Sequence, residues 1–114
     1  MIKTSTTDPI EIAFIPPAIL GAPGALGITF APGRQGRSDW DRCEWRRDLN
    51  QDLARIRQLY GVKDVVSLLE LDEQHQLGIH DYRRVAKRQG ITLDRTFELY
   101  ALFGHTMRFG ASLN

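Results

Sequence analysis

The sequence has one cysteine, no excess of charge of either sign and no long hydrophobic run. A lone Cys43 cannot form an internal disulfide, which indicates a reducing compartment. The N-terminus lacks the apolar region of a signal peptide, and no stretch approaches the roughly 18 apolar residues of a membrane helix. Fifteen Lys and Arg against fourteen Asp and Glu give a formal charge of +1. We therefore expect a soluble, cytoplasmic protein that binds neither nucleic acid nor membranes.

The spacing of cysteines, histidines and glycines along the sequence also indicates no metal site and no dinucleotide site. The soft or borderline metal ligands are Cys43, His75, His80 and His105. No two of them have the spacing of a helical ligand pair or of a Cys-x-x-Cys clip. Gly21, Gly24 and Gly27 form G-x-x-G-x-x-G, but Pro23 interrupts it and a strand is expected after it, so turn formation explains these glycines. We expect no metal and no cofactor.

The composition is that of an ordinary globular domain, with 42% hydrophobic and 25% charged residues. A chain of 114 residues is long enough for one domain with one modest core. Residues 1–9 are polar and end in Asp-Pro, which predicts a flexible lead-in, with order beginning near Ile10 and a first ordered segment over 11–15. The prolines and glycines of 16–36 exclude a long helix and favour short strands, best placed at 26–30.

From Asp48 the hydrophobic residues recur at helical spacing, so we predict an amphipathic helix that Asp48 caps and Gly61 ends. The apolar, β-branched run 63–69 predicts a strand buried on both faces, as in parallel sheets. A short helical turn is expected to close at Gly78, a second helix to end at Gly90, and another strand to span 91–97. The fold class is therefore α/β, a partial parallel-sheet layer with flanking helices.

An arginine cluster occurs next to two tryptophans, Trp40 and Trp45. Its members are Arg42, Arg46 and Arg47. Guanidinium groups suit bidentate phosphate contacts, so the cluster could bind a phosphate. The alternative is that nearby carboxylates neutralise it in an ordinary mixed-charge surface. Those carboxylates belong to Asp39, Asp41, Glu44 and Asp48.

Cys43 lacks the surroundings of a catalytic thiolate, which needs backbone N–H groups and a nearby cation to stabilise it. Cysteine-dependent phosphatases place an Arg six residues after the cysteine, whereas here that position is Leu49. The residue before it is Arg42, not His, and no glycine lies between Cys43 and Leu49. We expect Cys43 to be a structural or incidental thiol.

Three stretches resemble a known family: IPPAILGAPGALGITFAPGRQGR, WRRDLNQDLARIRQLYGVKDVVSLLE and LGIHDYRRVAKRQGI. They are similar to the front half of the dual-specificity protein phosphatases related to the cyclin-dependent kinase inhibitor-associated phosphatase, bacterial members included. The resemblance covers roughly residues 10–92 and is most specific over 47–70. The family order is an N-terminal strand pair, an Arg-Asp-Leu helix, a Gly-Val turn and a Val-Ser-Leu-Leu strand.

The resemblance implies hydrolysis of phosphoprotein monoesters through a phosphocysteine, without a metal. The family's general-acid Asp and its later His-Cys-x5-Arg loop are missing here, since after Ile91 the chain reads TLDRTFELYALFGHTMRFGASLN. Asp94 lacks the family's Pro-containing context, so we do not assign it the acid role. We expect a phosphatase-like scaffold over 10–97 and a divergent tail over 98–114.

Three hypotheses about function follow from this resemblance. The first is a truncated or degenerate phosphatase without hydrolytic activity and without catalytic residues. The second is a phosphoprotein-binding or regulatory module. Its candidate phosphate- or partner-binding residues are Arg34, Arg37, Arg46 and Arg47. The third is one half of a split phosphatase, in which case the chain should self-associate through the edge of an unfinished sheet.

Overall fold

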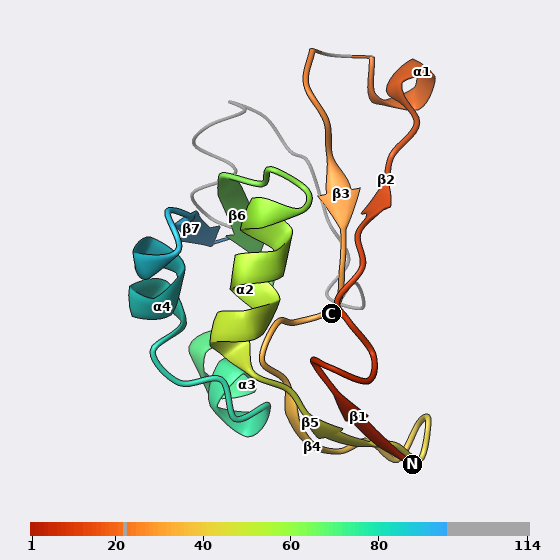
Figure 1. The fold of residues 1–114 in the computed structure, drawn as a ribbon, viewed down its shortest axis with the longest axis vertical. Coiled ribbons are helices and arrows are strands. Elements are labelled where there is room, and N and C mark those ends of the chain that lie inside the picture. The colour runs from red at the N-terminus through yellow and green to blue at the C-terminus, as the bar shows by residue number, and fades with distance from the viewer. Residues whose placement is uncertain (22, 96–114) are drawn as a thin grey trace.

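The structure is a computed structural model that describes residues 1–21 and 23–95 (Figure 1). Its strands are β1 (Ile2–Thr4), β2 (Ala13–Phe14), β3 (Gly27–Ile28), β4 (Gln35–Arg37), β5 (Glu44–Arg46), β6 (Asp64–Ser67) and β7 (Thr92–Arg95). Its helices are α1 (Pro17–Leu20), α2 (Leu49–Gln58), α3 (Leu71–Gln76) and α4 (Tyr82–Arg88). The strands form a three-stranded sheet in the order β1-β5-β4 and the pairs β2–β3 and β6–β7. The predicted α/β class is confirmed, with small, partly parallel sheets and flanking helices.

Helix α2 begins after its predicted N-cap, Asp48, and its last helical residue, Gln58, comes shortly before the predicted stop at Gly61. The Asp48 side chain accepts a hydrogen bond from the Gln51 N–H at 2.8 Å, which is the N-cap arrangement. Gly61 has φ of +69°, and the Val62 N–H donates to the Ile56 carbonyl at 3.1 Å. This is the bond of a left-handed helix end, and glycine adopts that conformation without steric cost.

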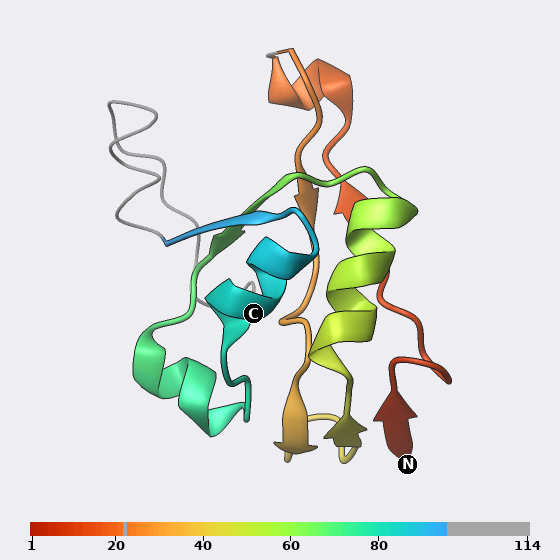
Figure 2. The same ribbon diagram turned by 60° about the vertical axis from the view of Figure 1, so that its left-hand side comes forward.

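The core lies where α2 and α4 pack together beside the β6–β7 pair (Figure 2). Its most deeply buried apolar residues include Ile10, Leu53, Ile56, Ile79 and Ala86. A fully buried Leu or Ile side chain contributes about 1.5–3 kcal/mol relative to an exposed one, so the aliphatic residues among these are a major source of stability.

Strands β6 and β7 are parallel, with Asp64 opposite Thr92 and Ser67 opposite Arg95. The parallel pairing was predicted, but burial of the strand on both faces was not found. Within the described residues Val65 and Val66 are only half-buried. Burial of both faces needs a covering layer on each side, and the described elements provide less than that.

The expectation of a loose N-terminal lead-in before Ile10 was wrong for the first strand. Residues 2–4 form β1, which lies parallel to β5 with Lys3 opposite Trp45. Ser5 is buried and accepts a hydrogen bond from the Asp48 N–H at 2.8 Å. The pairing is long-range, so the polar local composition of the segment carried no sign of it.

A hairpin arm, residues 12–30, extends from the body in both ribbon views (Figures 1 and 2). It contains β2, β3 and, between them, the four-residue helix α1, where only turns and strands were expected. Gly21 ends α1 with φ of +64°. No residue of α1 is buried, and Ile19 is 75% exposed. In the part of the chain that the structure describes, no helix is long and apolar enough to cross a membrane.

Candidate functional site

The four predicted binding arginines do not form one cluster, because strand alternation sends them to opposite faces of the β1-β5-β4 sheet. Trp45 pairs with Lys3 on β1 and with Gly36 on β4, and neighbouring residues of one strand point to opposite faces. Arg37 and Arg46 therefore lie on the face away from Trp45. Arg34 and Arg47, by contrast, lie within reach of the Trp45 ring.

The face of Arg37 and Arg46 is exposed and partly neutralised. Arg46 Nη2 lies 2.6 Å from Glu44 Oε2, and both side chains are well exposed. Arg37 is opposite Glu44 in the register and is also exposed. Pairs of this kind contribute little to stability in water. The Arg46–Glu44 pair agrees with the alternative that nearby carboxylates neutralise the arginines. Arg37 has no salt bridge among the described residues.

Cations and aromatic rings gather on the other face, around Trp45, which is only 7% exposed. The Phe30 ring centroid lies 5.3 Å from that of Trp45. Arg34 Cζ is 4.9 Å and Lys3 Nζ is 5.1 Å from the centroid of the Trp45 ring. Positive groups at such distances are attracted to the electron-rich faces of aromatic rings. We call Lys3, Arg34 and Trp45 the cation–indole cluster.

Arg47 has a structural role in this arrangement. Its guanidinium makes a bidentate pair with Asp52, with Nε and Nη2 each 2.9 Å from a carboxylate oxygen. Nη1 also donates to the Thr4 carbonyl, and Asp52 accepts from the Gly33 N–H at 2.9 Å. Both charged side chains are buried, with 0% and 1% of their surfaces exposed. A ligand could use Arg47 only by displacing Asp52.

Two buried N–H groups of the cation–indole cluster have no hydrogen-bond acceptor among the described residues. They are Arg34 Nε and Trp45 Nε1, the buried side-chain polar atoms without a hydrogen-bond partner in the described part of the chain. Most buried polar atoms in folded proteins have a hydrogen-bond partner, so two such donors in one place can indicate a site for a water or an ion.

Asp41 is an acid whose charge interacts with both cations of the cluster. Its pKa is below the usual value, first because it accepts a hydrogen bond from the Cys43 N–H, and also because Ser38, Lys3 and Arg34 favour its charged form. Asp41 is fully exposed, so it neutralises the two cations only weakly.

Lys3 is the residue of this cluster that sequence reasoning missed. It lies in the segment read as a lead-in, and its approach to Trp45 depends on the pairing of β1 with β5 across 42 residues. Two apolar residues, Met1 and Ile2, are followed by an unbroken polar run, so no alternation marks this segment as a strand.

Cys43 is buried, and its thiol lies 3.4 Å from the Asp41 carbonyl oxygen. Burial and this backbone contact fit a structural thiol. His75 and His80 have ring centroids 5.8 Å apart, but no group of three metal-ligating residues occurs within the described ranges. His105 lies outside the described residues.

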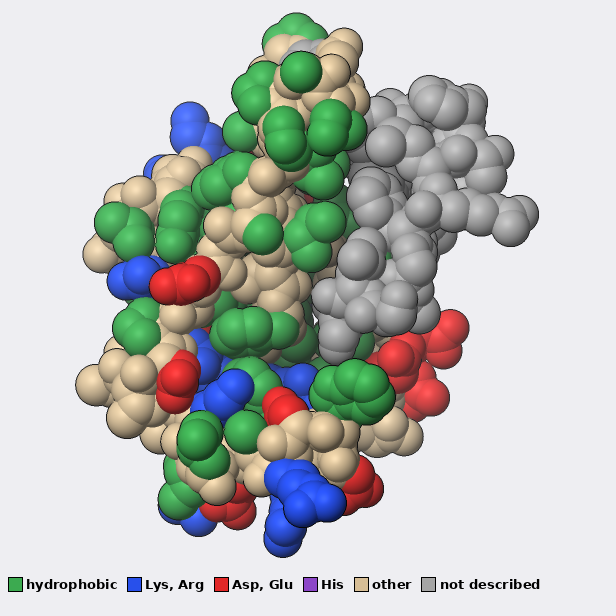
Figure 3. All heavy atoms as spheres, turned by 90° about the vertical axis from the view of Figure 1, so that its right-hand side faces the viewer, with side chains coloured by type: hydrophobic (Ala, Val, Ile, Leu, Met, Phe, Trp, Pro, Cys, Tyr) green, Lys and Arg blue, Asp and Glu red, His purple; other side chains and the backbone are tan. Residues whose placement is uncertain are grey.

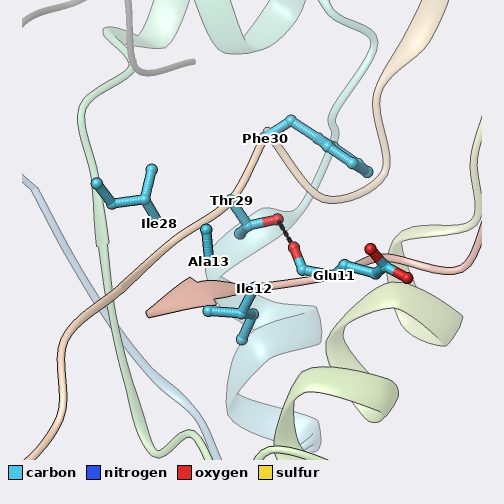
Figure 4. Close-up of a pocket in the computed structure, with 6 residues that line it drawn as sticks. All are labelled: Glu11, Ile12, Ala13, Ile28, Thr29 and Phe30. Atoms are coloured by element: carbon cyan, nitrogen blue, oxygen red, sulfur yellow. Dashed lines mark hydrogen bonds between the residues drawn. The ribbon is translucent and has the colours of Figure 1, made fainter. Parts of the chain in front are cut away.

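A shallow hollow of about 610 Å³ lies at the base of the hairpin arm (Figure 4). Its lining residues are Glu11, Ile12, Ala13, Ile28, Thr29 and Phe30. The Thr29 hydroxyl donates to the Glu11 carbonyl at 2.8 Å, and Glu11 is the one titratable residue of the lining. The hollow therefore offers apolar surface and no catalytic group pair.

The arrangement of helices and strands resembles part of a phosphatase fold. One solved structure with this arrangement is a crystal structure of kinase-associated phosphatase in which the catalytic-site cysteine is substituted by serine. The two agree with a TM-score of 0.61 over 76% of this chain at 18% sequence identity, a likeness of fold alone. The chain spans 45% of the length of that structure. No protein-family model and no curated protein sequence matches it.

Proposed function

We propose that this chain is a degenerate relative of the dual-specificity phosphatases, a scaffold that does not hydrolyse phosphomonoesters by itself. The observation that carries this proposal is the combination of a phosphatase-like fold with an unsuitable cysteine. Cys43 is 6% exposed, and the position of the phosphate-binding Arg is taken by Leu49. A thiolate nucleophile needs access to the phosphorus atom and a cation beside the thiolate. A free thiol also supports the cytoplasmic location expected from the sequence.

Hydrolysis of an aryl phosphate by the purified 114-residue chain tests this proposal. We expect no turnover above the buffer blank under conditions in which an active cysteine-dependent phosphatase gives full turnover. A Cys43→Ser variant is the matched control. Clear turnover that co-purifies with the chain would overturn the proposal, whether or not Cys43→Ser abolishes it.

A scaffold without hydrolysis can still hold a phosphorylated protein. One observation supports this binding function: the cation–indole cluster has cations without salt bridges among the described residues. Guanidinium groups bind phosphate oxygens with charge-assisted hydrogen bonds. Saturable binding of a phosphopeptide, with no binding of the unphosphorylated peptide, is the expected result.

Complementation by another polypeptide is the second candidate function, supported by exposed apolar surface. Residues 12–33 contain no charged side chain, and hydrophobic side chains gather over the hairpin arm in Figure 3. Phe14 is 48% exposed, and Val65 and Val66 of β6 are half-buried. Large apolar patches mark interaction surfaces or cause association.

Light scattering coupled to gel filtration tests whether the exposed apolar surface binds a second copy of this chain. We expect species larger than a monomer at micromolar concentration, and a shift towards monomer when Ile19 and Phe14 are replaced by Ser. A monodisperse monomer over the whole concentration range would remove self-association from the candidates.

A further inference from the structure

We infer that the cation–indole cluster is the phosphate-binding subsite, with Arg34 and Lys3 as the groups that contact a phosphomonoester. This inference rests on the proposed binding function and names the face of the sheet that performs it. It adds Lys3 and Trp45, which the sequence did not mark as a pair, and it leaves out Arg37 and Arg46 on the opposite face.

The charge balance of this face favours an anion. Three cations approach the Trp45 ring, and only Arg47 has a buried carboxylate partner, Asp52. Neither Lys3 nor Arg34 takes part in a salt bridge within the described ranges. Asp41 interacts with both of them, but it is exposed and already accepts the Cys43 N–H. A net positive charge therefore persists beside a buried aromatic surface.

The unsatisfied donors are the second, independent observation. Trp45 is more than nine-tenths buried, and its Nε1 has no acceptor among the described residues. Arg34 Nε, on the guanidinium 4.9 Å from the same ring, has none there either. Buried N–H groups without acceptors are uncommon in folded proteins and are often satisfied by a water or an ion. A bound anion beside Arg34 supplies acceptor oxygens at this place.

The local backbone leaves space next to the cluster. Gly36 is the β4 residue opposite Trp45, and a Cβ atom built there would meet no atom within 4 Å. The ligand we expect is a phosphomonoester dianion, because it offers three acceptor oxygens and two charges to two cations. Carboxylates offer fewer oxygens and one charge, so they should bind more weakly.

Trp45 itself can report on binding. The chain has two tryptophans, and Trp40 is 95% exposed, so Trp40→Phe removes the background signal without touching the core. In this variant Trp45 fluorescence would be followed during titration with phenyl phosphate, inorganic phosphate and sulfate at constant ionic strength and a pH above about 7, where the phosphate is largely dianionic. Calorimetry with the unmodified chain would give the same affinities without a reporter.

The expected result is saturable binding of phenyl phosphate with a change in Trp45 fluorescence. Arg34→Ala should weaken it by roughly tenfold or more, and Lys3→Gln should weaken it several-fold. Arg34→Lys keeps the charge but loses the bidentate guanidinium, so its affinity should lie between those of the unmodified chain and Arg34→Ala. Arg37→Ala is the matched control, because it removes the same charge from the opposite face, and it should leave the affinity unchanged. Urea unfolding of each variant shows whether it is folded.

The outcomes separate this inference from the broader proposal. If Arg37→Ala or Arg46→Ala abolishes binding while Arg34→Ala and Lys3→Gln do not, the inference is wrong and the proposed binding function stands. If none of the three anions binds saturably at millimolar concentration, both are wrong, and the hydrolysis proposal is unaffected. If phosphate and sulfate bind as tightly as phenyl phosphate, the site takes free anions and not a phosphorylated group on a protein, which also overturns the inference.

Discussion

Asp52→Asn is expected to be among the most destabilising isosteric changes in this chain. The substitution keeps the shape of the side chain and removes its charge. Arg47 would then remain buried with its charge uncompensated, because both of its strong hydrogen bonds go to the Asp52 carboxylate. Asp52 also accepts from the Gly33 N–H, so the pair joins α2 to the loop before β4 and, through Arg47 and the Thr4 carbonyl, to β1.

The magnitude follows from the burial of both groups. Removing one partner of a buried ion pair costs about 3–5 kcal/mol. The matched control is Glu44→Gln, which breaks the exposed Arg46–Glu44 pair at 2.6 Å and should cost at most about 0.5 kcal/mol. Complete domains have stabilities of only about 5–15 kcal/mol, so the first change threatens folding and the second does not.

Urea unfolding, followed by circular dichroism, is the assay. With a slope of about 2 kcal/mol per molar urea, Asp52→Asn should lower the midpoint by about 1.5–2.5 M, and Glu44→Gln by about 0.3 M or less. The double variant Arg47→Met with Asp52→Asn should recover part of the loss, because no buried charge is then left without a partner. Equal midpoints for Asp52→Asn and Glu44→Gln would refute the reasoning, since they would mean that the Arg47–Asp52 pair is solvated in solution.

Three further predictions concern stability. Gly33→Ala should cost about 1–3 kcal/mol more than Gly36→Ala, since both glycines have positive φ but only the Gly33 Cβ would meet Leu49, at 2.7 Å; comparison of the two urea midpoints checks this. Asp48→Ala removes the N-cap of α2 and should cost about 1 kcal/mol, whereas Asp48→Asn should retain most of the stability. Burial raises the pKa of Tyr82 above its usual value, so the folded state holds its proton more tightly; stability should fall as the pH rises above about 10, and Tyr82→Phe should remove that part of the fall in an alkaline unfolding series.

The sequence alone determined the elements whose signals are local. Helix α2 was predictable from its hydrophobic period together with Asp48 and Gly61, because capping and left-handed helix ends involve residues only a few positions apart. The turn at Gly78 and the end of α4 near Gly90 followed for the same reason, since both glycines have positive φ. The absence of a Cys-x5-Arg motif around Cys43 was likewise visible in the sequence.

The tertiary structure decided which arginine does what. Arg46 and Arg47 are neighbours in the sequence, yet strand alternation exposes the first and buries the second against Asp52. From the sequence, Asp48 was a candidate neutralising partner, whereas in the structure Asp48 caps α2 and Asp52 pairs with Arg47. The place of Lys3 beside Trp45 depends on a strand pairing across 42 residues. Local composition fixes helix ends and turns, but the faces of a sheet and the partners of a buried charge depend on contacts between distant segments.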